Sequence, residues 1–404
     1  MSEAKCKIDE KDLSGFKDFR SLKPLLKRLH KVGTKRDKAG NRNLHMDEYC
    51  LLVLMWLYNP VVDSLRGIQQ CSEFASVRKR LGVGRASMGS LSESVRIFAP
   101  DLLRGIAEEL SEQLPVHTPK GFGQVKKTVT AVDGSVFKVL AQIAQLAWLP
   151  TSGGKSSCGF RLHAQFEVFR KTAARIDVTG ANPKGDADER VVLQKTVEPG
   201  RCYLMDRGYA KYELFNVINE SGSDYVCRIR DNLPWKVLED LPLTEADRAA
   251  RVISDQVVEF GTPNSRTKPP DHGCRVVVVS AKPHNSKRKS ANGGPDCDGK
   301  IRIVTNMMDV PAEIIATLYA YRWTVEIYFR TIKQMLGCRH LLSTKSEGVE
   351  IQAYLAIIAC ILIMVHTGRT PTKRTYEFIC FYMLGVATLE ELTAHISKLK
   401  PQSR

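Results

Sequence analysis

The sequence predicts an α/β protein in which a mixed β-sheet with flanking helices is interrupted by a β-rich insertion and bordered by helical N- and C-terminal regions. The spacing of apolar residues is the main reason for this prediction. It is helical before residue 115 and after residue 311, and it takes the strand period of two after residue 119. Residues 231–300 add short alternating segments separated by loops rich in Gly, Pro, Asn and Lys.

Residues 1–119 are predicted to form a helical, DNA-binding region. Residues 1–45 contain thirteen Lys or Arg against six Asp or Glu, and residues 22–29 mix apolar with basic side chains. That mixture suits a helix lying on a phosphate backbone. Short helical patterns on both sides of residues 82–84 fit a helix-turn-helix or, equally well, a three-helix packing without DNA contacts.

Capping residues indicate where three of these N-terminal helices begin. Asp47 is the predicted N-cap of a helix over residues 49–58, and Asp63 is the predicted N-cap of the next. Pro100 is well placed at the start of a helix over residues 101–114.

The middle of the chain has the element order of a ribonuclease-H-like core, predicted to occupy residues 120–230. Strands are predicted at 127–132, 162–169, 174–178, 202–205 and 224–230, and helices at 186–196 and 212–219. After the insertion (231–300), residues 301–345 complete the core with a strand at 301–305 and a helical stretch opened by Pro311. Residues 346–404 are predicted to be a C-terminal helical region.

Composition favours a soluble protein with a polyanionic partner. Lys and Arg number 60 against 44 Asp and Glu, which gives a net charge of +16. Such an excess fits nucleic acid, although it also serves solubility alone. Eleven cysteines without a CxxC pair indicate reduced thiols, and no signal peptide opens the chain. The apolar run 353–365 is too short to cross a bilayer, so we expect a core helix and a cytoplasmic protein.

Tyr319, Arg322, Glu326 and Lys333 share one wall of a predicted helix. They fall within about 60° of one another and span about 21 Å. A neighbouring stripe is apolar and consists of Val325, Phe329, Ile332 and Leu336. One alternative is a solvated stripe with an Arg322–Glu326 pair; the other is a metal-and-phosphate site.

Two further carboxylates follow predicted core strands. Asp133 is expected to end the first strand before Gly134-Ser135, and Asp206 ends the fourth. Each could simply cap a turn, but strand ends are where ligands gather in open α/β sheets. Three carboxylates without His or Cys suit Mg²⁺ or Mn²⁺, and such a site can hold two ions. The sequence has neither a P-loop nor a G-x-S-x-G motif, so no nucleotide cofactor is expected.

These motifs resemble the DDE transposases of bacterial insertion sequences, in the insertion-sequence-four family. That family's Y-x2-R-x3-E-x6-K signature is matched by Tyr319, Arg322, Glu326 and Lys333, its D-G-[ST] by Asp133-Gly134-Ser135, and its D-R-G-[YF] by Asp206-Arg207-Gly208-Tyr209. The resemblance covers residues 120–366 strongly. All three motifs occur in order, which makes an accidental match very improbable.

The resemblance implies a function and a set of site residues. Asp133, Asp206 and Glu326 would be the catalytic, metal-binding triad for two Mg²⁺ or Mn²⁺ ions. The DNA-binding residues would be Tyr319, Arg322, Lys333, Trp323 and Arg207. Trp323 could stack an extruded base or, alternatively, pack in the core, and Trp235 is a second aromatic candidate.

Cut-and-paste transposition is the activity that the resemblance implies. It proceeds by cleavage at the transposon ends through a DNA hairpin, followed by strand transfer into target DNA. The partners would be double-stranded DNA, namely terminal inverted repeats and target, and a second subunit in a homodimeric synaptic complex; no membrane is involved, and the location would be the bacterial nucleoid. Alternatives on the same fold are a domesticated DNA-binding protein and a structure-specific nuclease, and a basic coat protein is a third possibility.

Overall fold

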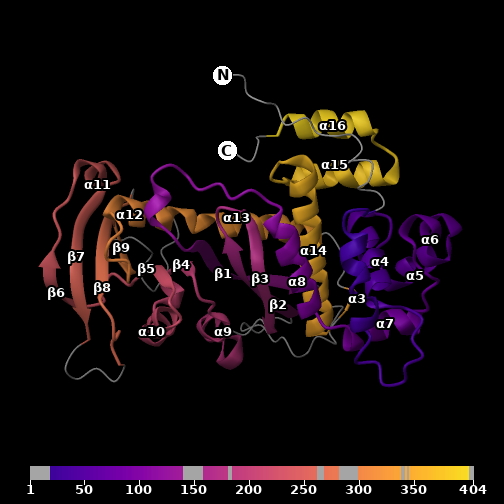
Figure 1. Ribbon diagram of the computed structural model, residues 1–404, viewed down its shortest axis with the longest axis horizontal. Helices are drawn as coiled ribbons and strands as arrows, with labels where there is room; N and C mark the ends of the chain where they lie inside the picture. Colours follow the sequence, from indigo (N-terminus) through magenta and orange to yellow (C-terminus); the bar gives the residue numbers. More distant parts are fainter. Residues whose placement is uncertain are drawn as a thin grey trace.

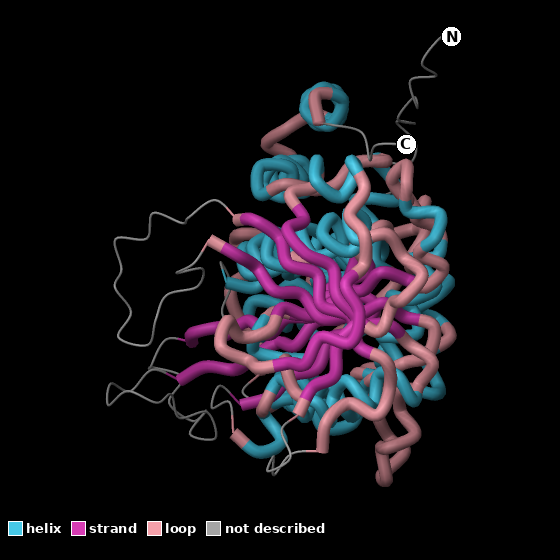
Figure 2. Tube along the Cα trace, turned by 90° about the vertical axis from the view of Figure 1, so that its left-hand side faces the viewer, coloured by secondary structure: helices cyan, strands magenta, loops and turns pink. Residues whose placement is uncertain are grey.

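The computed structural model describes residues 19–139, 158–180, 184–261, 268–281, 299–337, 342–343 and 345–399. Its centre is one nine-stranded sheet with the strand order β3-β2-β1-β4-β5-β9-β8-β7-β6. The N-terminal helices stand beyond the β3 end of this sheet, and strands β6 to β8 form the other end (Figure 1). Figure 2 shows that the strands twist progressively and that helices cover both faces.

The first five strands have the topology of a ribonuclease-H-like core. They are β1 (Thr128–Val139), β2 (Cys158–Glu167), β3 (Thr172–Gly180), β4 (Arg201–Met205) and β5 (Asp224–Arg228). β1, β2 and β3 form an antiparallel meander, and β4 and β5 continue the sheet in parallel with β1. Helices α9 (Glu189–Thr196) and α10 (Tyr212–Glu220) make the two crossovers. The predicted fold class is confirmed.

β1 is longer than predicted, which corrects the expected position of Asp133. The strand does not end there but runs on to Val139, and Asp133 pairs with Ala164 of β2. Parallel pairing with β4 nevertheless stops at Ala131. Beyond that pair β1 continues as a hairpin with β2, so Asp133 lies where β1 and β4 part.

The inserted segment extends the core sheet. Its strands are β6 (Trp235–Asp240), β7 (Val252–Phe260) and β8 (Cys274–Ser280), and β9 (Lys300–Thr305) joins them antiparallel to β5. The β-rich content predicted for this region is therefore present, within the same sheet as the core. The basic run Lys287-Arg288-Lys289 lies outside the described residues.

The N-terminal helices follow the predicted pattern, but two of their caps differ. They are α2 (Lys23–Lys27), α3 (Leu29–Val32), α4 (Met46–Tyr58), α5 (Leu65–Glu73), α6 (Ala75–Leu81), α7 (Met88–Ile97) and α8 (Asp101–Glu112). His45, not Asp47, caps α4, because the Glu48 carboxylate accepts the backbone N–H of His45. Asp47 instead bonds to the His30 ring at 2.9 Å, and Ser64 replaces Asp63 as the cap of α5.

Apolar side chains alternate between the two faces of the sheet and build a core on each. On one face, Ala131 of β1 and Leu204 of β4 belong to the cluster that includes helices α12 (Ala312–Tyr321) and α13 (Trp323–Gly337). On the opposite face, Val132 and Met205 belong to the cluster that includes Leu193 of α9. Alternate residues along β1 or β4 therefore face α12 and α13 on one side and α9 on the other.

Helix α14 (Ser346–Thr367) joins the N-terminal helices to the sheet. It packs against α4, α7 and α8 on one side and against β3 and α13 on the other. Its 22 residues are long and apolar enough to cross a membrane, which corrects the shorter length predicted from the sequence, yet 89% of its apolar window is buried inside the protein. It is a core helix, as predicted. Helices α15 (Lys373–Leu384) and α16 (Leu389–Ser397) complete the chain.

The inserted strands are fastened to the start of α12. Arg275 of β8 and Asp255 of β7 form a buried ion pair, 2.6 Å between Nε and Oδ1, and the Arg275 guanidinium also donates to the backbone carbonyl of Val310. Asp247 of α11 (Glu245–Ala249) accepts the backbone N–H of Glu313 at 2.9 Å. Removing one member of a buried pair typically costs about 3–5 kcal/mol, so this junction is firmly held.

We predict that Glu350 of α14 makes stability depend on pH. Burial raises its pKa to about 7, the nearby Asp177 and Asp101 add to the rise, and Arg175 opposes it. The folded chain thus keeps a proton that the unfolded chain loses near pH 4.5, and this stabilising contribution disappears as the pH rises through 7.

Denaturant unfolding of wild type and Glu350→Gln should therefore agree near pH 4.5 and separate near pH 8. There the variant should be more stable by on the order of 1 kcal/mol after allowance for partial exposure. Glu112→Gln, at an exposed position of α8, is the matched control and should show no such divergence. A constant difference between wild type and Glu350→Gln at both pH values would contradict the prediction.

Candidate active site

The strand register sets Asp133 and Asp206 side by side. Ala131 of β1 pairs with Leu204 of β4, so Asp133 and Asp206, each two residues farther along, lie at the same level. Adjacent strands are about 4.8 Å apart, and the alternation of side chains directs both acids to the face covered by α12 and α13. The proximity expected of these carboxylates is therefore built into the backbone.

Arg228 extends this row onto the next strand. Leu204 of β4 pairs with Val226 of β5, which places Arg228 level with Asp206. Val226 belongs to the core under α12 and α13, and the parity of β5 places Arg228 on the same face. Our sequence analysis missed this residue, although the alternation of Tyr225 and Cys227 with Val226 and Arg228 could have indicated it.

Glu326 reaches the row from above, on a helix that is not continuous. Tyr319 lies on α12, whereas Glu326 and Lys333 lie on α13, and Arg322 is the residue between the two helices. The predicted single helix is thus divided at Arg322, whose backbone stays right-handed and makes three-residue hydrogen bonds to Tyr319 and Val325. The predicted apolar stripe is buried at Val325, Phe329 and Ile332. The side chain of Leu336 lies outside the described part.

Arg322 is the central cation of the site. Its side chain is 8% exposed, and Nη2 contacts Glu326 Oε1 at 2.9 Å. Burial disfavours its charge, but Tyr319, Glu326 and Asp133 more than compensate, so the pKa of Arg322 is raised. Arg322 is buried whereas Glu326 is 36% exposed, so the description of a solvated stripe does not fit Arg322.

The charges of Asp206 and Glu326 both act on Asp133. The pKa of Asp133 is raised to about 6, chiefly by burial and further by the charges of Asp206 and Glu326. The backbone N–H of Gly134 and the charge of Arg322 act in the opposite direction. A cation placed among the acids would therefore stabilise the ionised form of Asp133.

The donor chemistry of the row fits a hard divalent ion. Asp133 Oδ1 and Asp206 Oδ1 each accept one backbone N–H, at 2.8 and 2.7 Å, and Glu326 is bound to Arg322. Across the described residues, no three His, Cys, Asp or Glu side chains are already arranged around a common ion position. The acids therefore supply suitable oxygens, and in this conformation Arg322 neutralises one of them.

The remaining predicted residues lie around this row. Lys333 Nζ is 5.3 Å from the centre of the Phe137 ring, over the far part of β1. Trp323 is 56% exposed and stacks on the Arg322 guanidinium at 4.8 Å, so the alternative of core packing is wrong for this residue. Arg207 is partly exposed in the 3-10 turn after Asp206. Trp235 starts the outermost strand, where its indole donates to Gln256.

Gly134 is explained by the opposite face of the sheet. A Cβ at this position would lie 2.8 Å from Cδ of Glu189, the first residue of α9, and that carboxylate is paired with Arg161 of β2. A larger side chain would have to displace this ion pair. Glu189 and Arg161 thus brace the segment of β1 that carries Asp133, and the sequence offered no signal for this contact.

Comparison with known proteins follows this geometry. Residues 124–362, more than half of the chain, match the family model described as "Transposase DDE domain". The chain is 25% identical over 310 residues to "Probable transposase for insertion sequence element IS5377" of Geobacillus stearothermophilus, covering 76% of this chain and 75% of the relative. It is 29% identical over 209 residues to "Putative transposase y4zB" of Sinorhizobium fredii, covering 51% and 53%.

Among solved structures, the chain is similar to one described as "Cryo-EM structure of piggyBac transposase synaptic complex with hairpin DNA (SNHP)". The TM-score is 0.39 with 11% identity, and the likeness covers 97% of this chain and 82% of that one. A likeness of this size is too weak to bear on the chemistry.

We predict that Gly134→Ala destabilises the protein by about 1–3 kcal/mol, because the new methyl group overlaps the Glu189 carboxylate. Gly105→Ala is the matched control, since a Cβ there meets nothing within 4 Å on helix α8. It should be neutral or stabilising by up to about 1 kcal/mol. Equal unfolding free energies for the two variants would show that the space over Gly134 is not restricted.

Proposed function

The chain belongs to the transposase DDE domain family, and we propose that it excises an insertion sequence and joins it to target DNA, with Asp133, Asp206 and Glu326 as the catalytic triad. One observation carries this assignment of residues. Support comes from the register of β1 against β4, in which Asp133 and Asp206 are level, and from α13, which carries Glu326 and packs on β1.

These acids would hold Mg²⁺ or Mn²⁺. When bound, such ions lower the pKa of an attacking water or hydroxyl group and stabilise the leaving oxygen of a phosphodiester. The protein supplies the fixed positions: the two Asp side chains belong to a strand and a strand end braced from both faces, and Glu326 lies on a helix in which Val325, Phe329 and Ile332 are buried. Rigid supports of this kind favour a site that is ready before the substrate arrives.

Arg322 would exchange partners when DNA and metal bind. In the protein alone it neutralises Glu326, which keeps three acids tolerable in a half-buried place. A metal at Glu326 would free the guanidinium, whose planar fork suits a phosphate oxygen pair. Arg228 lies level with Asp206 on the adjacent strand and is a second candidate to bind the scissile strand.

The hairpin route is supported by an aromatic side chain at the protein surface. Trp323 is exposed and stacks on Arg322, so its ring lies beside the cation nearest the triad. A ring in that position can stack on a base extruded from the duplex, which would stabilise a sharply bent strand. Membership of the insertion-sequence-four group, the terminal repeats as binding sites and a homodimeric synaptic complex belong to the same proposal and rest on the sequence motifs.

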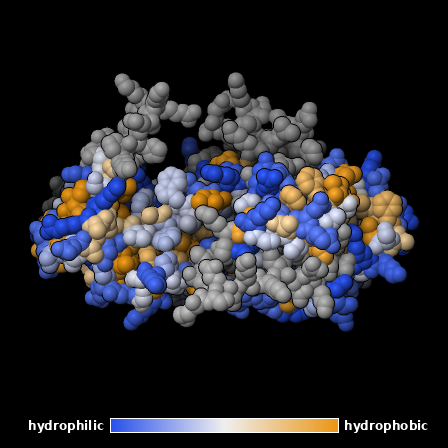
Figure 3. Space-filling model, turned by 90° about the horizontal axis from the view of Figure 1, so that it is seen from above, coloured by the Kyte–Doolittle hydropathy of each residue, from blue (hydrophilic) through white to orange (hydrophobic). Residues whose placement is uncertain are grey.

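The N-terminal helices would supply affinity for DNA. Arg78, Lys79 and Arg80 are exposed on α6, and α7 follows after a short turn, as in the helix-turn-helix alternative. Figure 3 shows the molecule from above relative to Figure 1. The surface on this side is mostly hydrophilic, with apolar residues interspersed. Contacts with phosphates would make binding strongly salt-dependent.

A structure-specific nuclease on the same fold is the second candidate. It would cleave strands with the same acids but would not join the liberated 3′-hydroxyl to a second duplex. Strand-transfer products from a transposon-end duplex and a target plasmid separate the two functions, because only a transposase yields joined products.

We predict that Asp133→Asn, Asp206→Asn and Glu326→Gln each reduce cleavage of a transposon-end duplex in Mg²⁺ by a factor of about 10³ or more while end binding persists. The variants remove charge and keep side-chain size, and the basic surface that binds DNA is unchanged. Asp309→Asn, at an exposed position before α12, is the control and should cleave normally. Near-normal cleavage by any triad variant would exclude that residue from the triad.

We predict that Lys333→Ala impairs hairpin formation more than first-strand nicking. A cation two turns from Glu326 can hold the bent strand, whereas nicking needs only the activated water. Lys333→Arg should restore activity only partly, because a planar fork does not replace a compact ammonium. Gel separation of nicked, hairpin and fully cut products is the measurement. An unchanged product distribution for Lys333→Ala would return Lys333 to the role of a surface residue.

A further inference from the structure

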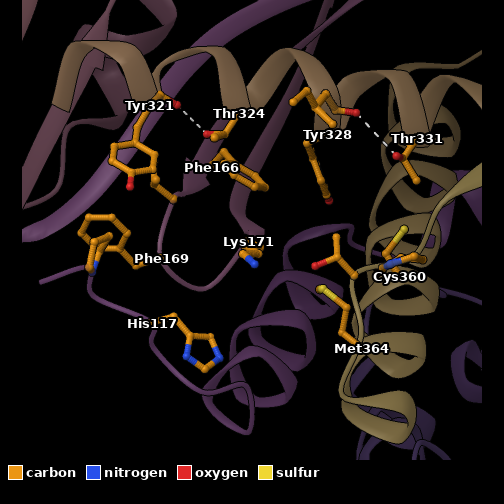
Figure 4. A pocket seen from close by; sticks show the side chains of 15 residues that line it. His117, Phe166, Phe169, Lys171, Tyr321, Thr324, Tyr328, Thr331, Cys360 and Met364 are labelled. Carbon is orange, nitrogen blue, oxygen red and sulfur yellow. Dashed lines mark hydrogen bonds between the residues drawn. The ribbon is translucent and has the colours of Figure 1, made fainter. Parts of the chain in front are cut away.

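A cavity of about 360 Å³ lies behind the helix that carries Glu326. Figure 4 shows it between α13, the turn that joins β2 to β3, and α14. Its lining includes His117, Phe166, Phe169, Lys171, Tyr321 and Tyr328. The size falls within the range of pockets for small organic ligands, about 300–1,000 Å³.

One side of the cavity is formed by the surface of α13 that faces away from Asp133, Asp206 and Glu326. At about 100° per residue, Thr324, Ile327, Tyr328 and Thr331 centre about 150° around the helix from Glu326. An occupant would therefore touch the catalytic helix without touching the triad. The cavity is distinct from the site described above.

Two pairs of aromatic rings form walls of the cavity. Phe166 and Tyr328 have ring centres 4.8 Å apart, and Phe169 and Tyr321 pack edge to face at 5.7 Å. Such surfaces accept a flat ring by offset or edge-to-face contact. Aliphatic and sulfur-containing side chains, such as Met364, complete the apolar lining, so a planar aromatic body matches this part of the cavity.

Lys171 places a positive charge among these apolar walls. Its Cα adopts the left-handed conformation, φ 59°, that bulky residues rarely take, and its ammonium points into the cavity (Figure 4). In the described part of the chain, its side chain makes neither an ion pair nor a hydrogen bond, and burial lowers the pKa of Lys171. His117 Nε2, also at this cavity, is buried without a hydrogen-bond partner among those same residues.

We propose that this cavity binds a small planar aromatic carboxylate, with the ring between the aromatic walls and the carboxylate paired with Lys171. A carboxylate satisfies the isolated ammonium and can accept from His117 when its Nε2 is protonated. A neutral aromatic molecule would leave the half-buried Lys171 ammonium without a partner. The proposal concerns binding alone and does not depend on the transposase activity.

The test is calorimetric titration of the full chain with 2-naphthoate and with its uncharged analogue 2-naphthamide. Wild type should bind the carboxylate with a Kd below about 1 mM and at least about tenfold more tightly than the amide. Lys171→Met, which keeps the aliphatic stem, should weaken 2-naphthoate binding by about tenfold or more and leave 2-naphthamide binding unchanged. Lys184→Met, at an exposed position after β3, is the matched control and should bind like wild type.

Three outcomes would overturn the proposal: no binding of 2-naphthoate at about 1 mM, equal affinity for the two ligands, or an unchanged affinity in a folded Lys171→Met variant. The comparison of the two ligands with wild type needs no variant, so it decides the question even if Lys171→Met fails to fold. Because no DNA is present, loss of strand cleavage in other experiments has no bearing on the result.

Discussion

The burial of α14 is the constraint on which the architecture depends. Hydrophobic burial is non-directional, so an apolar helix enclosed on all sides holds its neighbours together without fixing their orientation. Two hydroxyl groups supply direction: Tyr58 of α4 donates to the carbonyl of Ala359, and Tyr354 donates to the carbonyl of Ile176 on β3 at 3.0 Å. One helix thereby aligns the N-terminal helices with the sheet edge, and α13 rests against the same helix.

The proposed triad of Asp133, Asp206 and Glu326 takes its geometry from backbone pairing more than from side-chain contacts. Asp133 and Asp206 are level because two parallel strands are in register, and Arg228 continues the series because a third strand follows the same register. Only Glu326 depends on a helix, α13, which is anchored by buried residues, and the preceding helix α12 is held by the junction with β8. The insertion thus contributes to the site mechanically, through Arg275 and Asp247, far from the acids themselves.

Much of this could be predicted from the sequence, because local periodicity survives in the folded chain. The ribonuclease-H-like element order could be predicted from apolar spacing, and the three motifs were identified by resemblance to a known family. The pairing of distant segments could not be predicted from the sequence. The alternation in β7 and β8 is the same whether these strands form their own sheet or extend the core, and nothing local shows that β9 pairs with β5.

Errors at single residues have similar physical causes. Asp133 was expected to end β1 because Asp-Gly favours turns, but pairing with β2 keeps the strand extended through Gly134. Asp47 is an ordinary cap residue by type, yet a tertiary contact with His30 engages it. Arg322 interrupts the predicted helix although no Gly or Pro stands between residues 312 and 336. The contact of Glu189 with Gly134 joins residues 55 positions apart and has no sequence signature.

In the nine-stranded sheet, β6 is an edge strand. Its residues are almost all exposed, and a strand with unpaired backbone groups is a template for association with other chains. Lys236, Glu239 and Asp240 put charges of both signs along it, and a register shift between Val237 and Glu239 bends it against β7. Irregularity and charge discourage a second molecule from adding a strand there. Loss of β6 would expose the edge of β7, whose residues are more buried and more apolar, so the outermost strand shields the strands behind it from edge-to-edge association.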